Sequence, residues 1–174
     1  MKRLMIPLAA LGLIALLVAG CSTSPTLRVG TYDSRAIAIA FSNSQEGMDF
    51  VASLQAEMAK ASEAKNDSLV RSIEKTAMTY QILSHLRAFS LGSVSDILGK
   101  HKAEVDVVAK EAGVSVMVSK FELMCTRAGV DTVDVTLPLV QIFKPQEQAL
   151  KWISDIRKQE PMPMLDVLAI PPEE

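Results

Sequence analysis

The feature that most constrains the fold of this chain is a long helical pattern between Gln45 and Ser90. Apolar residues recur there at spacings of three and four, which places them on one face of an α-helix. They form two series on either side of the polar run SEAKNDS at 62–68: Val51, Leu54, Met58 and Ala61, and then Leu69, Ile73, Ala77, Tyr80 and Leu83. The middle of the chain is therefore predicted to be helical.

The polar run decides whether this region is one helix or two. The two apolar series are nearly in phase, so one long helix through the polar run is an alternative. Asn66, however, tolerates the left-handed conformation that ends a helix, and Asp67 is a good N-cap for the next one. We therefore favour a helical hairpin at about 45–90, with arms of roughly 20 residues or about 30 Å each.

The segment RVGTYDSRAIAIAFSNS at 28–44 has two interpretations. Its first residues, up to Tyr32, read as a strand. Beyond them, the alternation of Ile37, Ile39 and Phe41 with alanines is typical of a half-buried strand. An Asp-Ser pair before an alanine-rich run is instead typical of a capped helix start. The residues alone leave this choice open.

Three more helices are predicted downstream. Ser93 or Ser95 can cap a helix over 95–112, with His101 on its apolar face and Gly113 as its C-terminal glycine. The other two are a short helix capped by Thr136 and running through Phe143, and a last helix after Pro145 with Leu150, Ile153 and Ile156 facing inward. The Pro-rich tail at 161–174 is predicted to run extended, because prolines interrupt helices.

Two further strands are predicted in the second half of the chain. VSVMVS at 114–119 alternates strictly and is rich in β-branched residues, and 131–135 is a second extended segment. We expect Val116 and Val118 to be core residues of a strand paired with Val29 and its neighbours. These elements together predict an α+β fold that is mostly α.

The N-terminus has the order of a secretory signal. A short basic start is followed by an apolar run that ends at Val18, with small residues before Cys21. The sequence LVAGC resembles the lipobox of bacterial lipoproteins, which implies cleavage after residue 20, acyl chains such as palmitate on Cys21, and a polar tether at 21–26. An ordinary signal peptide that leaves a cysteine is the alternative. The lipobox resemblance implies that the protein lies in the cell envelope, anchored to the membrane through Cys21. In a Gram-negative cell, Ser22 implies the outer membrane facing the periplasm.

Composition bounds the remaining possibilities. The formal charge of −2 becomes −4 when the signal, with Lys2 and Arg3, is removed, and this mildly acidic balance argues against a nucleic-acid partner. The mature length is that of one ordinary domain. With Cys21 lipidated, Cys125 has no partner for an intrachain disulfide, and we expect it to be a small buried residue.

Residue patterns typical of catalysis do not occur. His85 and His101 lie on separate predicted helices without metal-ligand spacing, and no phosphate-binding glycine loop or nucleophile elbow is present. Asp33, Asp131 and Asp134 are predicted to be caps and turn residues. In the polar cluster YDSR at 32–35, we expect the arginine to lie at the surface or to pair with a carboxylate. We therefore predict no enzyme activity, no cofactor and no metal.

The segments VGTYDSRAIA and VAKEAGVSVMVSKFELMCTRAGVDTVDVT resemble the Skp family of periplasmic chaperones, also called OmpH-like proteins. The resemblance covers about two-thirds of the mature chain and implies a Skp-like domain at 27–160, with a helical hairpin on a small β-sheet. It also implies that the strand at 28–32 is followed by a helix from Ser34 to Phe41. In that family three chains join through their strands, so a homo-trimer is expected, and the hairpins surround unfolded outer-membrane proteins.

Two functions from different classes follow. The first is a chaperone or holdase for envelope proteins, and the second is a structural or adaptor lipoprotein that docks one partner through its hairpin. A holdase needs exposed apolar surface along the arms. Alanines in the first arm allow close helix packing, so we expect little apolar surface to be exposed there, which favours the adaptor.

Overall fold

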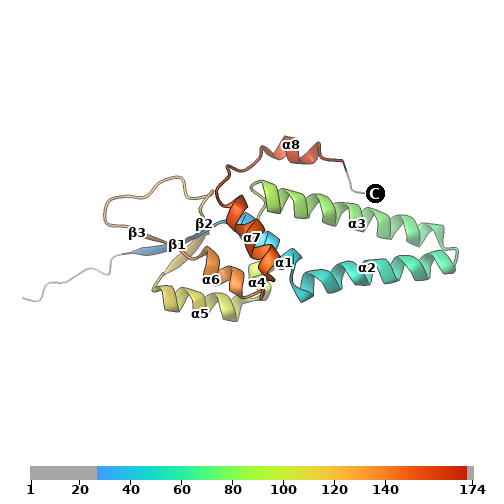
Figure 1. Ribbon diagram of the computed structural model, residues 1–174, viewed down its shortest axis with the longest axis horizontal. Coiled ribbons are helices and arrows are strands. Elements are labelled where there is room, and N and C mark those ends of the chain that lie inside the picture. Colours follow the sequence, from blue (N-terminus) through green and yellow to red (C-terminus); the bar gives the residue numbers. More distant parts are fainter. Residues whose placement is uncertain (1–26, 172–174) are drawn as a thin grey trace, which may run out of the picture.

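The computed structural model describes residues 27–171, which form an α+β fold that is mostly α. A small sheet lies at one end of an elongated molecule and a helical hairpin projects at the other (Figure 1). Most of the other helices lie between them, whereas the last helix lies beside the second arm of the hairpin. The predicted signal at 1–20, the lipidation site Cys21 and the tether at 21–26 lie outside the described residues, as do 172–174. Among the described residues, no helix combines the length and the apolar character that crossing a bilayer requires.

The sheet has three strands in the order β2-β1-β3, and both outer strands run parallel to the central one. They are β1 (Arg28–Tyr32), β2 (Val116–Ser119) and β3 (Asp131–Asp134). Val29 is opposite Val116 in the register, so the predicted pairing of these two strands is confirmed. The centre of β1 is tightly packed, because a Cβ atom on Gly30 would come within 2.9 Å of the Met117 side chain.

Only one face of the sheet packs against the helices. Tyr32, Met117 and Val133 lie on that face and contact the hydrophobic core. The prediction that Val116 is a core residue is wrong: its exposed fraction is 50%, and Val118 on the same face is only partly buried. Alternation separates the two faces of a strand, but it does not tell which face a second layer will cover.

Helix α1 (Ser34–Ser42) lies at the centre of the molecule and settles the ambiguous segment in favour of a helix. Asp33 is its N-cap, as predicted, and its carboxylate accepts from the backbone N–H of Arg35. Apolar residues lie on all sides of α1 because α3, α6 and α7 pack around it. Its alanines let these neighbours approach closely, and its isoleucines fill the space between them.

The hairpin consists of α2 (Gln45–Glu63) and α3 (Asp67–Phe89), so the alternative of one long helix is wrong. The turn is shifted by one residue from our prediction. Lys65, with a φ of 50°, takes the left-handed position that we assigned to Asn66. The Asn66 side chain instead caps α3 and accepts from the backbone N–H of Leu69 at 3.1 Å.

The predicted helix over 95–112 is broken at His101 into α4 (Ser95–Lys100) and α5 (Lys102–Ala112). The His101 ring packs edge-on against Phe143, with 5.0 Å between ring centroids, and its Nε2 atom lies 3.1 Å from the Glu46 carboxylate. These contacts coincide with the break. Gly113 ends α5 in the left-handed conformation, as predicted.

The last helices cover α1 and the hairpin base. They are α6 (Thr136–Gln141), α7 (Glu147–Ile156) and α8 (Met164–Leu168). The prediction that the tail from 161 onward is extended is wrong, because Pro163 precedes α8 at a position where a proline does not interrupt the helix. Val167 is buried where α8 packs against α3.

Candidate functional site

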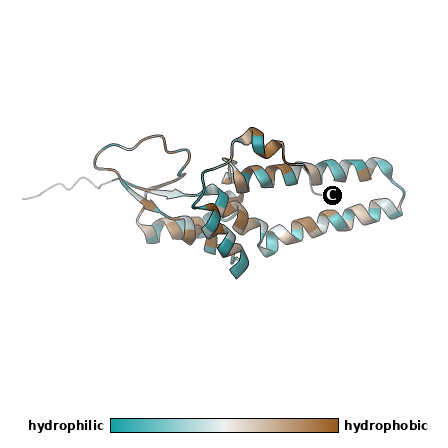
Figure 2. Ribbon diagram, turned by 45° about the horizontal axis from the view of Figure 1, so that its top comes forward, coloured by the Kyte–Doolittle hydropathy of each residue, from teal (hydrophilic) through white to brown (hydrophobic). Residues whose placement is uncertain are grey.

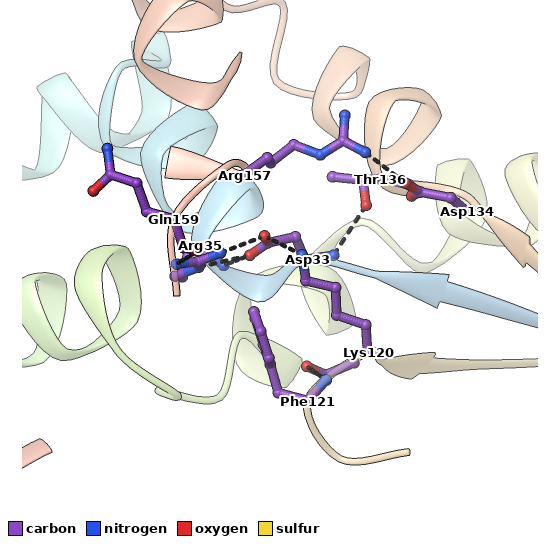
Figure 3. A network of polar contacts seen from close by, with 9 residues as sticks. Asp33, Arg35, Lys120, Phe121, Asp134, Thr136, Arg157 and Gln159 are labelled. Atoms are coloured by element: carbon purple, nitrogen blue, oxygen red, sulfur yellow. Dashed lines mark hydrogen bonds and ion pairs between the residues drawn. The ribbon is translucent and has the colours of Figure 1, made fainter. Parts of the chain in front are cut away.

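A buried ion pair lies at the junction of β1 and α1 (Figure 3). The Arg35 guanidinium donates from Nη2 to one carboxylate oxygen of Asp33 at 2.9 Å and from Nε to the other at 3.1 Å. The Lys120 ammonium lies 2.8 Å from the same carboxylate. Both Asp33 and Arg35 are fully buried, so the pair is isolated from water.

The two cations keep the Asp33 carboxylate ionised. Burial by itself would raise the pKa of Asp33, but the hydrogen bonds and charges of Arg35 and Lys120 outweigh it and hold this pKa below its usual range. Every oxygen of the carboxylate already has a partner. The arrangement therefore supports a structural role and leaves no free oxygen for acid–base chemistry.

This ion pair links four parts of the chain. The Asp33 backbone N–H donates to the Thr136 hydroxyl at 2.9 Å, and Arg35 Nη1 donates to the Gln159 carbonyl at 3.0 Å. The Arg35 guanidinium also lies 5.0 Å from the centre of the Phe121 ring. Our alternative of a surface arginine is therefore wrong, and that of a paired one is confirmed. The sequence carried no signal for its distant partners.

Thr136 shows how tertiary contacts replace a predicted cap. We expected its hydroxyl to cap α6, but this hydroxyl accepts from Asp33 of the β1–α1 junction instead. The Asp134 carboxylate accepts from the Thr136 backbone N–H at 2.8 Å and also pairs with Arg157. Asp131 pairs at the surface with Arg28 at 2.8 Å.

The remaining predicted candidates are not brought together. His85 lies near the end of α3 beside Phe89, whereas His101 lies at the α4–α5 break. Cys125 is exposed, so the prediction of a buried cysteine is wrong; it lies in the 120–130 segment, which leaves the sheet between β2 and β3. Within residues 27–171, no group of three or more His, Cys, Asp and Glu side chains is placed to hold a metal ion.

The hairpin exposes a series of large apolar side chains. Their exposed fractions lie between 38% and 50%, and the residues are Met48, Phe50, Val51, Leu69, Met78, Ile82 and Leu83. The run TAMTYQILSHL at 76–86 contains no Asp, Glu, Lys or Arg. Our expectation that the first arm exposes little apolar surface is therefore wrong, because the two arms pack on each other with one face only. Figure 2 shows apolar residues along both arms as well as in the body.

Between the arms lies an apolar cavity of about 700 Å³, which we call the arm cleft. Its walls come from both helices of the hairpin and from Ser42 at the end of α1, and they include no Asp, Glu, Lys or Arg. The main apolar residues are Val51, Leu54, Met58, Ile73, Ala77 and Tyr80. The Tyr80 ring also packs against the Phe50 ring, with 4.7 Å between the ring centroids. The volume is that of a typical ligand or side-chain binding site.

A second cavity of about 680 Å³ lies between the ends of α1 and α3 and one side of α7, and we call it the Trp152 pocket. Ser42 and Ser84 line both cavities, so the two are neighbours. The two differ in charge, since Asp155 and Glu160 contribute to the walls of the Trp152 pocket.

Comparison with known proteins gave no match: no protein-family model, no curated protein and no solved structure matches this chain.

Proposed function

We propose that this chain is a lipoprotein of the cell envelope, anchored through Cys21, that holds unfolded or partly folded envelope proteins with its helical hairpin. The observation that carries this proposal is the series of half-exposed apolar side chains on arms whose cleft contains no charge. The Skp resemblance of the sequence supports the same function.

Exposing these side chains is unfavourable in water. Full burial of one Leu, Met or Phe side chain contributes about 1.5–3 kcal/mol relative to exposure, so several half-exposed ones represent an appreciable binding energy. Contiguous exposed apolar surface on a protein usually marks a contact site. Many weak apolar contacts without charge pairing suit clients that differ in sequence, because such contacts need no fixed geometry.

The position of the anchor supports this role. Leu27 and Arg28 lie at the end of the sheet that is remote from the hairpin (Figure 1). A tether at 21–26 spans at most about 20 Å, because an extended residue covers about 3.3–3.6 Å. The sheet end would therefore lie near the membrane and the arms would extend away from it, facing the periplasm in a Gram-negative cell.

The sheet supports assembly of several chains, and the Skp resemblance implies that three chains join. Both β2 and β3 are edge strands, and the face with Val116 and Val118 is not covered by the helical core. A small sheet with open edges is marginal in water, and contacts between chains would cover both its edges and its apolar face. Three chains would then present three hairpins to one client.

The arm cleft favours a second candidate function, that of an adaptor for one dedicated partner. A single defined cavity between two helices fits an amphipathic helix that inserts its apolar face. A holdase would use the whole exposed surface of the arms, whereas an adaptor would use the cleft alone.

An aggregation assay separates the two functions. Residues 21–174 with Cys21→Ser are mixed with several unrelated outer-membrane proteins diluted from urea, and light scattering is followed. A holdase keeps all of them soluble, and Met78→Gln with Ile82→Gln abolishes this protection, since both side chains are exposed on α3. Glutamine keeps the helix propensity.

The matched control is Arg71→Gln with Glu74→Gln, which changes exposed charged positions on the same helix. This control should protect as well as the parent chain. The holdase would be overturned if the parent chain protected no client, or if the variant with Met78→Gln and Ile82→Gln protected clients as fully as the parent chain. The adaptor would then remain.

A further inference from the structure

The Trp152 pocket combines aromatic rings with carboxylates. It is lined by three aromatic side chains from two elements, His85 and Phe89 of α3 and Trp152 of α7. Two acidic residues, Asp155 and Glu160, line the same cavity, as does the apolar Ile39 of α1. Trp152 has an exposed fraction of 49%, so part of this lining residue is accessible to a ligand.

One wall of the pocket is held at both ends. At residue 159, the carbonyl of Gln159 accepts from the buried Arg35 guanidinium at 3.0 Å. At residue 162, the Met162 N–H donates to the Phe89 carbonyl at 2.9 Å, and the Ser90 hydroxyl donates to the Met162 carbonyl at 2.7 Å. Glu160 lies between these two fixed points. The wall is therefore preformed, which lowers the entropy cost of binding.

The charge of the walls selects the ligand. No Lys or Arg lines the cavity, so its formal charges are negative. The Asp155 carboxylate pairs at the surface with the Lys158 ammonium, with 3.0 Å between Oδ1 and Nζ. Glu160 is therefore the main charge that attracts a cation. Aromatic faces attract cations through the ring quadrupole, most strongly for Trp. The neighbouring arm cleft, without charged walls, has no such preference.

We propose that the Trp152 pocket binds a small organic ammonium ion with an apolar body. The ammonium group lies against Trp152 and Glu160, and the apolar body lies toward Ile39 and Phe89. A pocket of about 680 Å³ is large enough for such a molecule. This proposal does not depend on the holdase function, because it concerns a separate cavity.

The chain contains one tryptophan, so the fluorescence of Trp152 reports on this pocket without a label. Benzyltrimethylammonium is the probe, and neopentylbenzene is its neutral isostere of the same shape. Titration with the cation should give a saturable change in emission. Affinity for the neutral isostere should be about tenfold lower. Equal affinity for both would overturn the proposal.

A further probe distinguishes a free cation from a lipid headgroup. Phosphocholine carries the same ammonium group beside a phosphate, and the carboxylates of Asp155 and Glu160 should repel that phosphate. We expect phosphocholine to bind at least about fivefold more weakly than choline, which has the same ammonium group without the phosphate. Equal or tighter binding of phosphocholine would overturn the assignment to a free cation.

Variants test the roles of the two principal residues. Glu160→Gln should weaken binding of the cation about fivefold and leave the neutral isostere unchanged, a difference that a purely structural effect would not produce. Glu147→Gln is the matched control, because Glu147 is an exposed carboxylate of α7 outside the pocket. Trp152→Leu should abolish binding by calorimetry, and Trp152→Phe should retain part of it.

Circular dichroism melting confirms that each variant is folded. If Glu160→Gln binds the cation as tightly as the parent chain does, the charge assignment is wrong. If Trp152→Leu remains folded and still binds the cation with the parent affinity, the pocket is not the site.

Discussion

Asp33 and Arg35, only two residues apart in the chain, form a fully buried ion pair where the central strand passes into the central helix. The carboxylate caps α1 and also neutralises the guanidinium, whose Nη1 atom donates to the Gln159 carbonyl. One pair of side chains thus positions the central helix and one wall of the Trp152 pocket.

Removing one partner of this pair should strongly destabilise the fold. We expect Arg35→Met to lower the free energy of unfolding by about 3–5 kcal/mol, because it leaves a buried carboxylate with Lys120 alone. Urea denaturation measures the change. Arg28→Met removes the exposed pair with Asp131 and an exposed hydrogen bond to the Ala112 carbonyl, and should cost only about 1–2 kcal/mol. Equal effects of the two changes would contradict the structural role of the buried pair.

The same carboxylate should make stability depend on pH in the acid range. The pKa of Asp33 lies below its ordinary value of 3.8, so its contribution is fully present above about pH 4. It is lost as the pH falls through the lowered pKa of the folded state. Urea unfolding between about pH 2 and 6 should therefore show a decline that is shallower in Asp33→Asn. An identical slope in parent and variant would contradict the lowered pKa.

Gly47 should not tolerate a side chain although it lies inside a helix. A Cβ atom there would overlap the backbone carbonyl of Phe41 at the junction of α1 and α2. We expect Gly47→Ala to destabilise the protein by about 1–3 kcal/mol, by thermal or urea unfolding. Gly99→Ala is the control, because the Cβ at Gly99 in α4 meets no atom within 4 Å. That change should stabilise the protein by up to about 1 kcal/mol.

The uncovered face of the sheet should mediate assembly. Residues 21–174 with Cys21→Ser should be trimeric by light scattering as the concentration rises, and Val116→Asp should shift them to monomers that keep their helical circular dichroism. Val107→Asp is the control, since Val107 has an exposed fraction of 53% on α5, close to the 50% of Val116. A chain that is monomeric at every concentration, or a Val116→Asp variant that stays trimeric, would refute the trimer.

Lipidation of Cys21 is tested in cells that express the whole chain. A palmitate analogue should label the wild-type protein and leave Cys21→Ala unlabelled, because the thiol and the new amino terminus are the acylated groups. Fractionation should then place the wild-type protein in the membrane fraction. Equal labelling of both proteins would refute the anchor and the proposed location.

Local signals in the sequence predicted most of the secondary structure. The apolar spacing identified both arms of the hairpin, Asp33 was the expected cap of α1, and Gly113 the expected end of α5. These features act within a few residues, because a cap or a helical stripe depends only on near neighbours along the chain. The lipobox at Cys21 is also a local signal, and it remains a prediction.

Tertiary structure alone decided which surfaces are buried. Alternation placed Val116 on one face of a strand, but the helices cover the opposite face and leave it exposed. Arg35 is buried because the neighbouring Asp33 pairs with it, and because the Gln159 carbonyl and the Phe121 ring reach it from distant segments. Likewise, the Trp152 pocket forms only where the ends of α1, α3 and α7 meet. Burial depends on contacts between segments far apart in sequence, and no local pattern encodes those contacts.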